Sequence, residues 1–208
     1  MGRYNPRKRW EERQVFAMIL NSGIRPTSKT AAFAVVPNKL IGMYKSEAHA
    51  VWDTLRPLGI KSFVEVGRNM GGGLFFLACA CNKLERVLSI DIRKYELTDA
   101  VFPLWFKQND IELELVEHDS TTYEGHGEWD FVWIDGGHTG EIVAADIACW
   151  KDRCKYIGFH DFADRGRHNK HVRVFKDVVA EIKRCWEAYG WEPIGRRGRS
   201  DIIFATGK

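Results

Sequence analysis

The chain has 208 residues, of which 45% are hydrophobic and 28% charged, a composition that indicates one globular domain rather than a disordered segment. The formal net charge of +3 at pH 7 is too small to require sequence-independent binding of nucleic acid. No apolar run reaches the roughly 18 residues that a membrane span requires, so contact with a membrane is not expected.

The first 58 residues are predicted to form a helical and irregular cap segment. Apolar spacing indicates an amphipathic helix over residues 10–22. Residues 21–45 contain Gly, Pro, Ser, Thr and Asn, which is typical of an irregular connector. Ser46 is a helix-start signal, and the apolar positions after it predict a helix that ends at Gly59.

Residues 59–208 are assigned to a second unit, in which strands and helices alternate. Strands are expected at residues 63–66, 86–91, 113–117, 129–135, 156–160 and 201–206. Helices are expected at residues 74–81, 94–107, 139–150 and 172–189, the second of them broken near Pro103. This alternation predicts an α/β fold with a Rossmann-like, doubly wound, mostly parallel sheet, arranged as a three-layer sandwich.

A glycine-rich loop follows the first predicted strand. It reads Glu65-Val-Gly-Arg-Asn-Met-Gly-Gly-Gly, and glycines at such a place let the backbone turn sharply and approach a ligand. The helix that follows offers unpaired N–H groups to an anionic ligand. The spacing from Gly67 to Gly71 matches neither the Gly-x-Gly-x-x-Gly loop of dinucleotide-binding enzymes nor the phosphate-binding loop of ATPases, so an NAD-dependent oxidoreductase is disfavoured.

Polar residues also end the second and third predicted strands. Ligands of doubly wound sheets bind at the carboxyl ends of the strands. Asp91 stands where a carboxylate can accept hydrogen bonds from two ribose hydroxyls, and Asp119-Ser120 stands where an acceptor can contact a purine amino group. A strand-end aspartate can also be a simple helix cap, but three such features in order point to a nucleoside-containing cofactor.

These segments together resemble class I S-adenosylmethionine-dependent methyltransferases. The resemblance is to the small O-methyltransferase-like branch, with its E-x-G-x-x-x-G-G loop and I-D-G-x-H motif, and it covers residues 60–165. It implies that S-adenosylmethionine is the cofactor. The implied cofactor-binding residues are Glu65, Gly67, Arg68, Asn69, Gly71, Gly72, Asp91, Ile92, Asp119, Ser120 and Asp135.

The resemblance also implies a place for each part of the cofactor. Glu65 and Gly67 would shape the pocket for the methionine end, Asp91 would hold the ribose, and Asp119-Ser120 would flank the adenine. The loop departs from the family at residues 68–70, where smaller side chains are common. Arg68 is therefore also expected to reach substrate or solvent as an alternative to the cofactor.

Two chemical routes are consistent with the residues after the fourth and fifth strands. In the first, His138 or His160 is a general base near the cofactor methyl group, with Asp135 beside it. In the second, Asp135 and Asp161 bind a divalent cation, Mg²⁺ or a similar ion, which lowers the pKa of the substrate hydroxyl. Related metal-dependent enzymes support the second route, but Phe162 stands where their third ligand is usually found. The purely structural alternatives are a helix-capping His138 and a buried His160.

The cysteines and the N-terminus predict a cytoplasmic protein. No apolar segment of a signal peptide follows the basic first ten residues. The cysteines lack the Cys-x-x-Cys spacing of metal and redox sites, so we expect reduced, mostly buried thiols. They are Cys79, Cys81, Cys149, Cys154 and Cys185.

The leading functional hypothesis is O-methylation of a small-molecule or sugar-like hydroxyl. Basic residues near both ends, at 3–9 and 196–199, favour a nucleic-acid or protein methyltransferase as the alternative. The loop at residues 164–171 is rich in hydrogen-bond donors and could recognise the acceptor. A non-catalytic S-adenosylmethionine-binding interaction protein is a third alternative, which the acidic strand ends argue against because unpaired buried carboxylates are costly. A homo-oligomer is an open alternative to a monomer.

Overall fold

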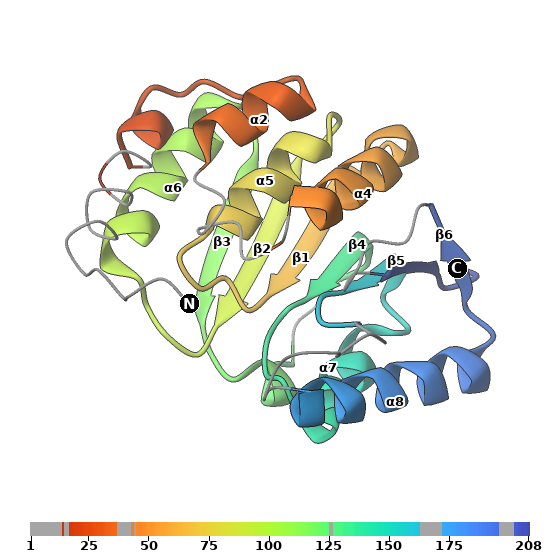
Figure 1. Cartoon of the computed structure of the whole chain (residues 1–208). Helices are drawn as coiled ribbons and strands as arrows, with labels where there is room; N and C mark the ends of the chain where they lie inside the picture. The colour runs from red at the N-terminus through yellow and green to blue at the C-terminus, as the bar shows by residue number, and fades with distance from the viewer. Residues whose placement is uncertain are drawn as a thin grey trace.

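A single mixed sheet forms the middle layer of the protein (Figure 1). The structure, a computed structural model, describes residues 17–36, 45–124, 127–162, 172–195 and 202–208, together with residues 14 and 43. The strands in these ranges are β1 (Ser62–Val66), β2 (Arg86–Asp91), β3 (Glu112–Glu117), β4 (Trp129–Ile134), β5 (Cys154–Phe159), β6 (Glu192–Ile194) and β7 (Ile202–Ala205). They lie in the order β3-β2-β1-β4-β5-β7-β6. The first five are parallel to one another, and β7 runs antiparallel to both β5 and β6.

Helices cover both faces of this sheet (Figure 1). On one face lie α2 (Lys29–Val35), α4 (Lys45–Leu55), α5 (Gly72–Ala80) and α6 (Glu96–Gln108); on the other lie α7 (Gly140–Trp150) and α8 (Val172–Tyr189). Successive strand residues point to opposite faces, so Phe63 packs in the core that contains α5 whereas Val64 packs in the core that contains α7. The predicted Rossmann-like three-layer sandwich is confirmed.

Two expectations about helices were wrong. The predicted irregular connector contains α2, whose N-cap Ser28 accepts a hydrogen bond from the Ala31 N–H. α6 continues through Pro103 instead of breaking there. Proline removes one hydrogen bond from a helix, but Phe102 and Trp105 on either side of it are fully buried, and this packing holds the helix together.

Two arginines connect the N-terminal segment to the sheet by binding the end of α5. The Arg25 guanidinium donates to the carbonyls of Ala78 (2.8 Å) and Cys81 (2.6 Å), and Arg56 donates to that of Cys79 (3.1 Å). Cations are favourable at a helix C-terminus, where the last carbonyls lack partners. The segment before Gly59 therefore packs against α5, in the layer of helices that also contains α4 and α6. The division of the chain after residue 58 stays a prediction.

One strand of the sheet was not predicted, whereas the state of the cysteines agrees with expectation. The short strand β6 at the sheet edge contains Pro193, a residue that edge strands tolerate. All five cysteines are free and four are buried, as expected. Among the described residues, no helix combines the length and the apolar character needed to cross a membrane.

Candidate active site

The carboxyl ends of five strands meet at one edge of the sheet. Main-chain hydrogen bonds continue past the strand ends and hold the loops side by side. The Gly67 N–H donates to the Ile90 carbonyl (2.9 Å), and the Asp135 N–H donates to that of Val66 (2.8 Å). The His160 N–H likewise donates to the Ile134 carbonyl (3.1 Å). The predicted site residues from β1, β2, β4 and β5 are thus neighbours.

The glycines of the loop are required by contacts inside the protein. Gly67 has φ of 92°, and a Cβ there would collide with the Asp135 carbonyl. Gly71 has φ of 78°, and a Cβ there would collide with the Phe102 ring. Contacts within the protein therefore exclude any residue other than glycine at both positions, whether or not a ligand is bound. At Gly67 the glycine loop lies directly against the turn after β4.

Arg68 points into the protein, so the expectation that it reaches substrate or solvent was wrong. Its side chain is 1% exposed and forms two hydrogen bonds of 3.0 Å with the Asp99 carboxylate in α6. A further bond of 3.0 Å runs from Nη1 to the Ser89 carbonyl. With its guanidinium engaged in this way, Arg68 attaches the glycine loop to α6 and β2, and its predicted contact with the cofactor through the side chain is not available.

Glu65 is a buried acid beside this arginine. Its Oε2 accepts a hydrogen bond of 2.8 Å from the Ser89 hydroxyl, and the residue is 2% exposed. Burial raises the pKa of Glu65 to about 8, against the smaller opposing effects of Ser89 and Arg68. The acid is therefore mostly protonated at neutral pH in the protein without ligand.

The raised pKa of Glu65 predicts a pH-dependent stability. The unfolded chain loses this proton near the ordinary value of 4.5 and the folded chain only near 8, so folding becomes less favourable as pH rises between the two. We expect the free energy of unfolding to fall by about 2 kcal/mol between pH 6 and pH 8. In Glu65→Gln, denaturant titrations over this range should show no such fall, whereas the exposed-site control Glu85→Gln should retain it. An equal fall in Glu65→Gln would contradict the assignment.

Asp91 supports the same loop from β2. One carboxylate oxygen accepts a hydrogen bond from the Asn69 N–H (2.7 Å) and the other from the Arg93 N–H (2.9 Å). Asn69 has φ of 48°, a left-handed conformation that this bond stabilises. The neighbouring Ile92 is 64% exposed, so an apolar side chain stands at the rim beside the carboxylate. This pair offers both a polar and an apolar contact to a ligand.

Asp119 and Ser120 follow β3 as expected, and Asp119 also caps the short helix η2 (Ser120–Thr122). Asp119 Oδ1 accepts hydrogen bonds from the Thr121 hydroxyl (2.7 Å) and N–H (3.0 Å). These bonds lower the pKa of Asp119. The capping interpretation of this aspartate therefore holds, and it fixes the orientation of the carboxylate at the same edge of the sheet.

Four polar side chains gather after β4 and β5. His138 Nδ1 lies 2.6 Å from Asp161 Oδ2, and His160 Nε2 lies 3.5 Å from Asp161 Oδ1. The hydrogen bond to Asp161 raises the pKa of His138, whose side chain is 56% exposed. Asp161 has φ of 62°, an uncommon conformation for a residue other than glycine. The four residues are Asp135, His138, His160 and Asp161.

Three of these side chains have the geometry of a metal site. One ligand atom from each of Asp135, His160 and Asp161 lies within 4.8 Å of the other two. His160, the residue before the second aspartate rather than after it, lies close enough to the two carboxylates to serve as a third ligand. A set of two carboxylates and one imidazole suits Mn²⁺, Fe²⁺ or Zn²⁺ better than Mg²⁺, which prefers oxygen ligands.

Several other predicted features lie outside the described residues. They are the basic residues near both ends of the chain and the donor-rich loop at residues 164–171. Three described residues that belong to the site or support it were not predicted from the sequence. These are Ser89 and Asp99, which hold Glu65 and Arg68, and the buried Asp146 of α7.

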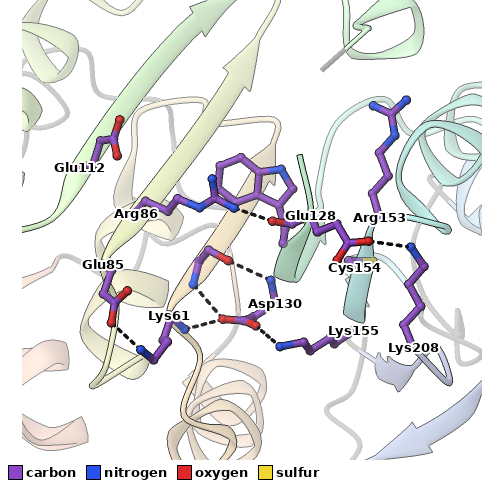
Figure 2. A pocket seen from close by; sticks show the side chains of 12 residues that line it. Lys61, Glu85, Arg86, Glu112, Glu128, Asp130, Arg153, Cys154, Lys155 and Lys208 are labelled. Carbon is purple, nitrogen blue, oxygen red and sulfur yellow. Dashed lines mark hydrogen bonds and ion pairs between the residues drawn. The ribbon is translucent and has the colours of Figure 1, made fainter. Parts of the chain in front are cut away.

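A pocket of about 480 Å³ lies at the opposite, amino edge of the sheet (Figure 2). Its charged groups largely bind one another. The Asp130 carboxylate accepts hydrogen bonds from the Lys61 N–H (2.8 Å) and from Lys155 Nζ (2.7 Å), while the Arg86 guanidinium lies 4.2 Å from the centre of the Trp129 ring. These contacts connect β1, β2, β4 and β5, so we interpret the pocket as part of the framework rather than as the active site.

Comparison with known proteins relates part of the sequence to a described family. Residues 64–162 match the sequence model of a family described as a methyltransferase domain. No curated protein sequence matches the chain.

Solved structures share the fold. A methyltransferase from Podospora anserina, PaMTH1 bound to S-adenosylhomocysteine, has 12% identity and a TM-score of 0.60, over 99% of this chain and 98% of that one. A candidate caffeoyl-CoA O-methyltransferase from Staphylococcus aureus has 12% identity and a TM-score of 0.59, over 77% and 82%. An O-methyltransferase from Bacillus cereus has 14% identity and a TM-score of 0.51, over 94% and 90%. At these identities the likeness establishes the fold alone. Residues 64–162 therefore match a methyltransferase domain, and the chain has the fold of methyltransferases that have been solved with S-adenosylhomocysteine bound.

Proposed function

We propose that the protein transfers the methyl group of S-adenosylmethionine to a hydroxyl oxygen of a small molecule. The observation that carries this proposal is the contact of His138 with Asp161 beside the glycine loop. Because Asp161 engages Nδ1, the Nε2 atom of His138 is the one that accepts the hydroxyl proton. The oxygen then bonds to the methyl carbon as the carbon–sulfur bond breaks, and that electron pair stays on sulfur as S-adenosylhomocysteine leaves.

In this proposal each part of the cofactor contacts a different group of residues. Glu65 and the backbone of the loop around Gly67 would contact the methionine end, and Asp91 with the exposed Ile92 would contact the ribose. Asp119 and Ser120 would contact the adenine. The S-adenosylhomocysteine bound in the structures from Podospora anserina and Bacillus cereus supports the same cofactor here.

Isothermal titration calorimetry tests the cofactor directly. We expect saturable binding of S-adenosylhomocysteine with one site per chain and no binding of NAD at the same concentration. Failure to bind S-adenosylhomocysteine would overturn the proposed function. A panel of phenols, sugars and hydroxylated acids, offered with methyl-labelled S-adenosylmethionine, then identifies the acceptor. An RNA arm of the same assay tests the alternative acceptor, which the basic termini favour.

A metal-dependent form of the same reaction is the second candidate, and the proximity of Asp135, His160 and Asp161 favours it. These residues would hold a divalent cation, which supplies Lewis acidity that lowers the pKa of a bound hydroxyl. Protein freed of metal with a chelator should then bind Mn²⁺ by calorimetry, and Asp135→Asn should lose that binding while the exposed control Asp152→Asn retains it. Full methyl transfer in chelator would assign the reaction to His138 alone.

The acceptor and the setting complete the proposal. The match to a methyltransferase domain supports a small-molecule acceptor. The five free cysteines support a cytoplasmic location. The segment before Gly59 is proposed as a cap of the main unit. A homo-oligomer is tested by light scattering of the purified protein.

A further inference from the structure

A second acid is buried near the same edge of the sheet. Asp146 lies in the middle of α7 and is fully buried. Neither carboxylate oxygen has a hydrogen-bond partner at bonding distance among the described residues. Burial raises the pKa of Asp146 to about 6. Since an unpaired buried acid destabilises a protein, a hydrophobic residue at this position would be expected unless the acid has a task.

The Ser120 hydroxyl is a polar group that interacts with this acid. A Cβ built at Gly136 would lie 3.5 Å from Asp146 Oδ2 and 4.0 Å from Ser120 Oγ, so both groups border the turn after β4. Ser120 favours the charged form of Asp146 and lowers its pKa, although less than burial raises it. The titratable groups that face the carboxylate are Asp119, at the cap of η2, and the Cys149 thiol of α7 itself.

The position of the Ser120 hydrogen decides what this hydroxyl can recognise. A hydroxyl carries one hydrogen and two acceptor lone pairs. When its hydrogen points inward to an ionised Asp146, only lone pairs remain for a ligand, and the hydroxyl accepts from a donor such as the exocyclic amino group of adenine. Ser120 is only partly buried, so it has access to a ligand that Asp146 lacks.

We propose that Asp146 is a positioning residue that orients the Ser120 hydroxyl as an acceptor and so makes the cofactor site select a 6-amino purine over a 6-oxo purine. The proposal rests on the proposed function, because it takes Ser120 to stand at the adenine. When Asp146 is protonated, it donates its own hydrogen to the Ser120 oxygen, and the Ser120 hydrogen turns outward. That hydrogen then faces the hydrogens of the purine amino group, which is unfavourable because both groups are donors. Selectivity should therefore weaken as pH falls below about 6.

Calorimetry with two ligands tests this role. S-adenosylhomocysteine and S-inosylhomocysteine differ at purine C6, which carries an amino group in the first and a carbonyl in the second, and at the neighbouring N1, which accepts in the first and donates in the second. At pH 8 we expect the wild type to prefer the adenosyl ligand by about tenfold or more, as is usual when a buried polar group is left unpaired by the wrong ligand. At pH 5.5 the preference should fall several-fold.

Two variants and one control complete the test. Asp146→Asn keeps the size of the side chain but supplies both a donor and an acceptor, so the preference should fall to about threefold or less and lose its pH dependence. Ser120→Ala, a change at a partly exposed position, should lower the preference similarly even if Asp146→Asn folds poorly. The exposed control Asp152→Asn should match the wild type.

The possible failures are distinguishable. If the wild type does not bind S-adenosylhomocysteine, the proposed function fails. If it binds, and Asp146→Asn and Ser120→Ala both retain the wild-type preference, the role of Asp146 is overturned while the cofactor assignment stands.

Discussion

Replacement of His138 by alanine is expected to lower the rate constant for methyl transfer by about 10²–10⁴-fold, the usual contribution of a general base. His138 is held by Asp161 at 2.6 Å and is exposed enough to meet an acceptor. Because its proposed task concerns the acceptor proton, binding of S-adenosylhomocysteine should change by less than about twofold. Single-turnover assays with labelled cofactor measure the rate separately from product release.

A conservative variant separates chemistry from structure at the same position. His138→Gln keeps a polar group that can reach Asp161 but removes a base of suitable pKa. It should be as slow as His138→Ala. A His138→Gln protein that transfers methyl groups at the wild-type rate would contradict the assignment of His138 as the proton acceptor.

Arg68→Ala is expected to lower the free energy of unfolding by about 3–5 kcal/mol, because it leaves one charge of a buried pair without its partner. The side chains of Arg68 and Asp99 are only 1% and 7% exposed. Asp99 would keep the Tyr95 N–H as a donor (3.0 Å) but lose both hydrogen bonds from the guanidinium. Urea denaturation followed by tryptophan fluorescence measures the change.

An exposed arginine provides the matched control. Arg184 also pairs with a carboxylate, that of Glu181, but its side chain is 61% exposed. Arg184→Ala should therefore cost about 1 kcal/mol or less. Equal losses in the two variants would show that burial of the Arg68–Asp99 pair has no special effect on stability.

The fold was predictable because each core strand has a clear local pattern. Segments such as Phe131-Val-Trp-Ile are apolar without interruption, as strands buried on both faces must be, and glycine or acidic residues follow them directly. Such patterns mark where each strand ends, and parallel topology brings those ends to one edge. The edge and most of its polar residues could therefore be identified from the sequence.

Other features depend on the direction of a side chain in three dimensions. Arg68 stands in a glycine-rich loop, where an exposed side chain is expected from the sequence. Only the position of α6 shows that its guanidinium binds the Asp99 carboxylate. Asp146 resembles any polar residue of an amphipathic helix until η2 is packed against α7. The continuity of α6 at Pro103 similarly depends on tertiary packing, which overrides a local breaking signal.

The close approach of Gly67 to the turn after β4 has a consequence for protein engineering. The loop and the turn are joined by the Asp135–Val66 hydrogen bond and leave no room for a Cβ at Gly67. A backbone change made near Asp135 to admit a new acceptor would displace the glycine loop as well. The range of acceptors is therefore better altered by substitutions in segments that do not contact Gly67. Such changes redesign the acceptor pocket and preserve the affinity for the cofactor.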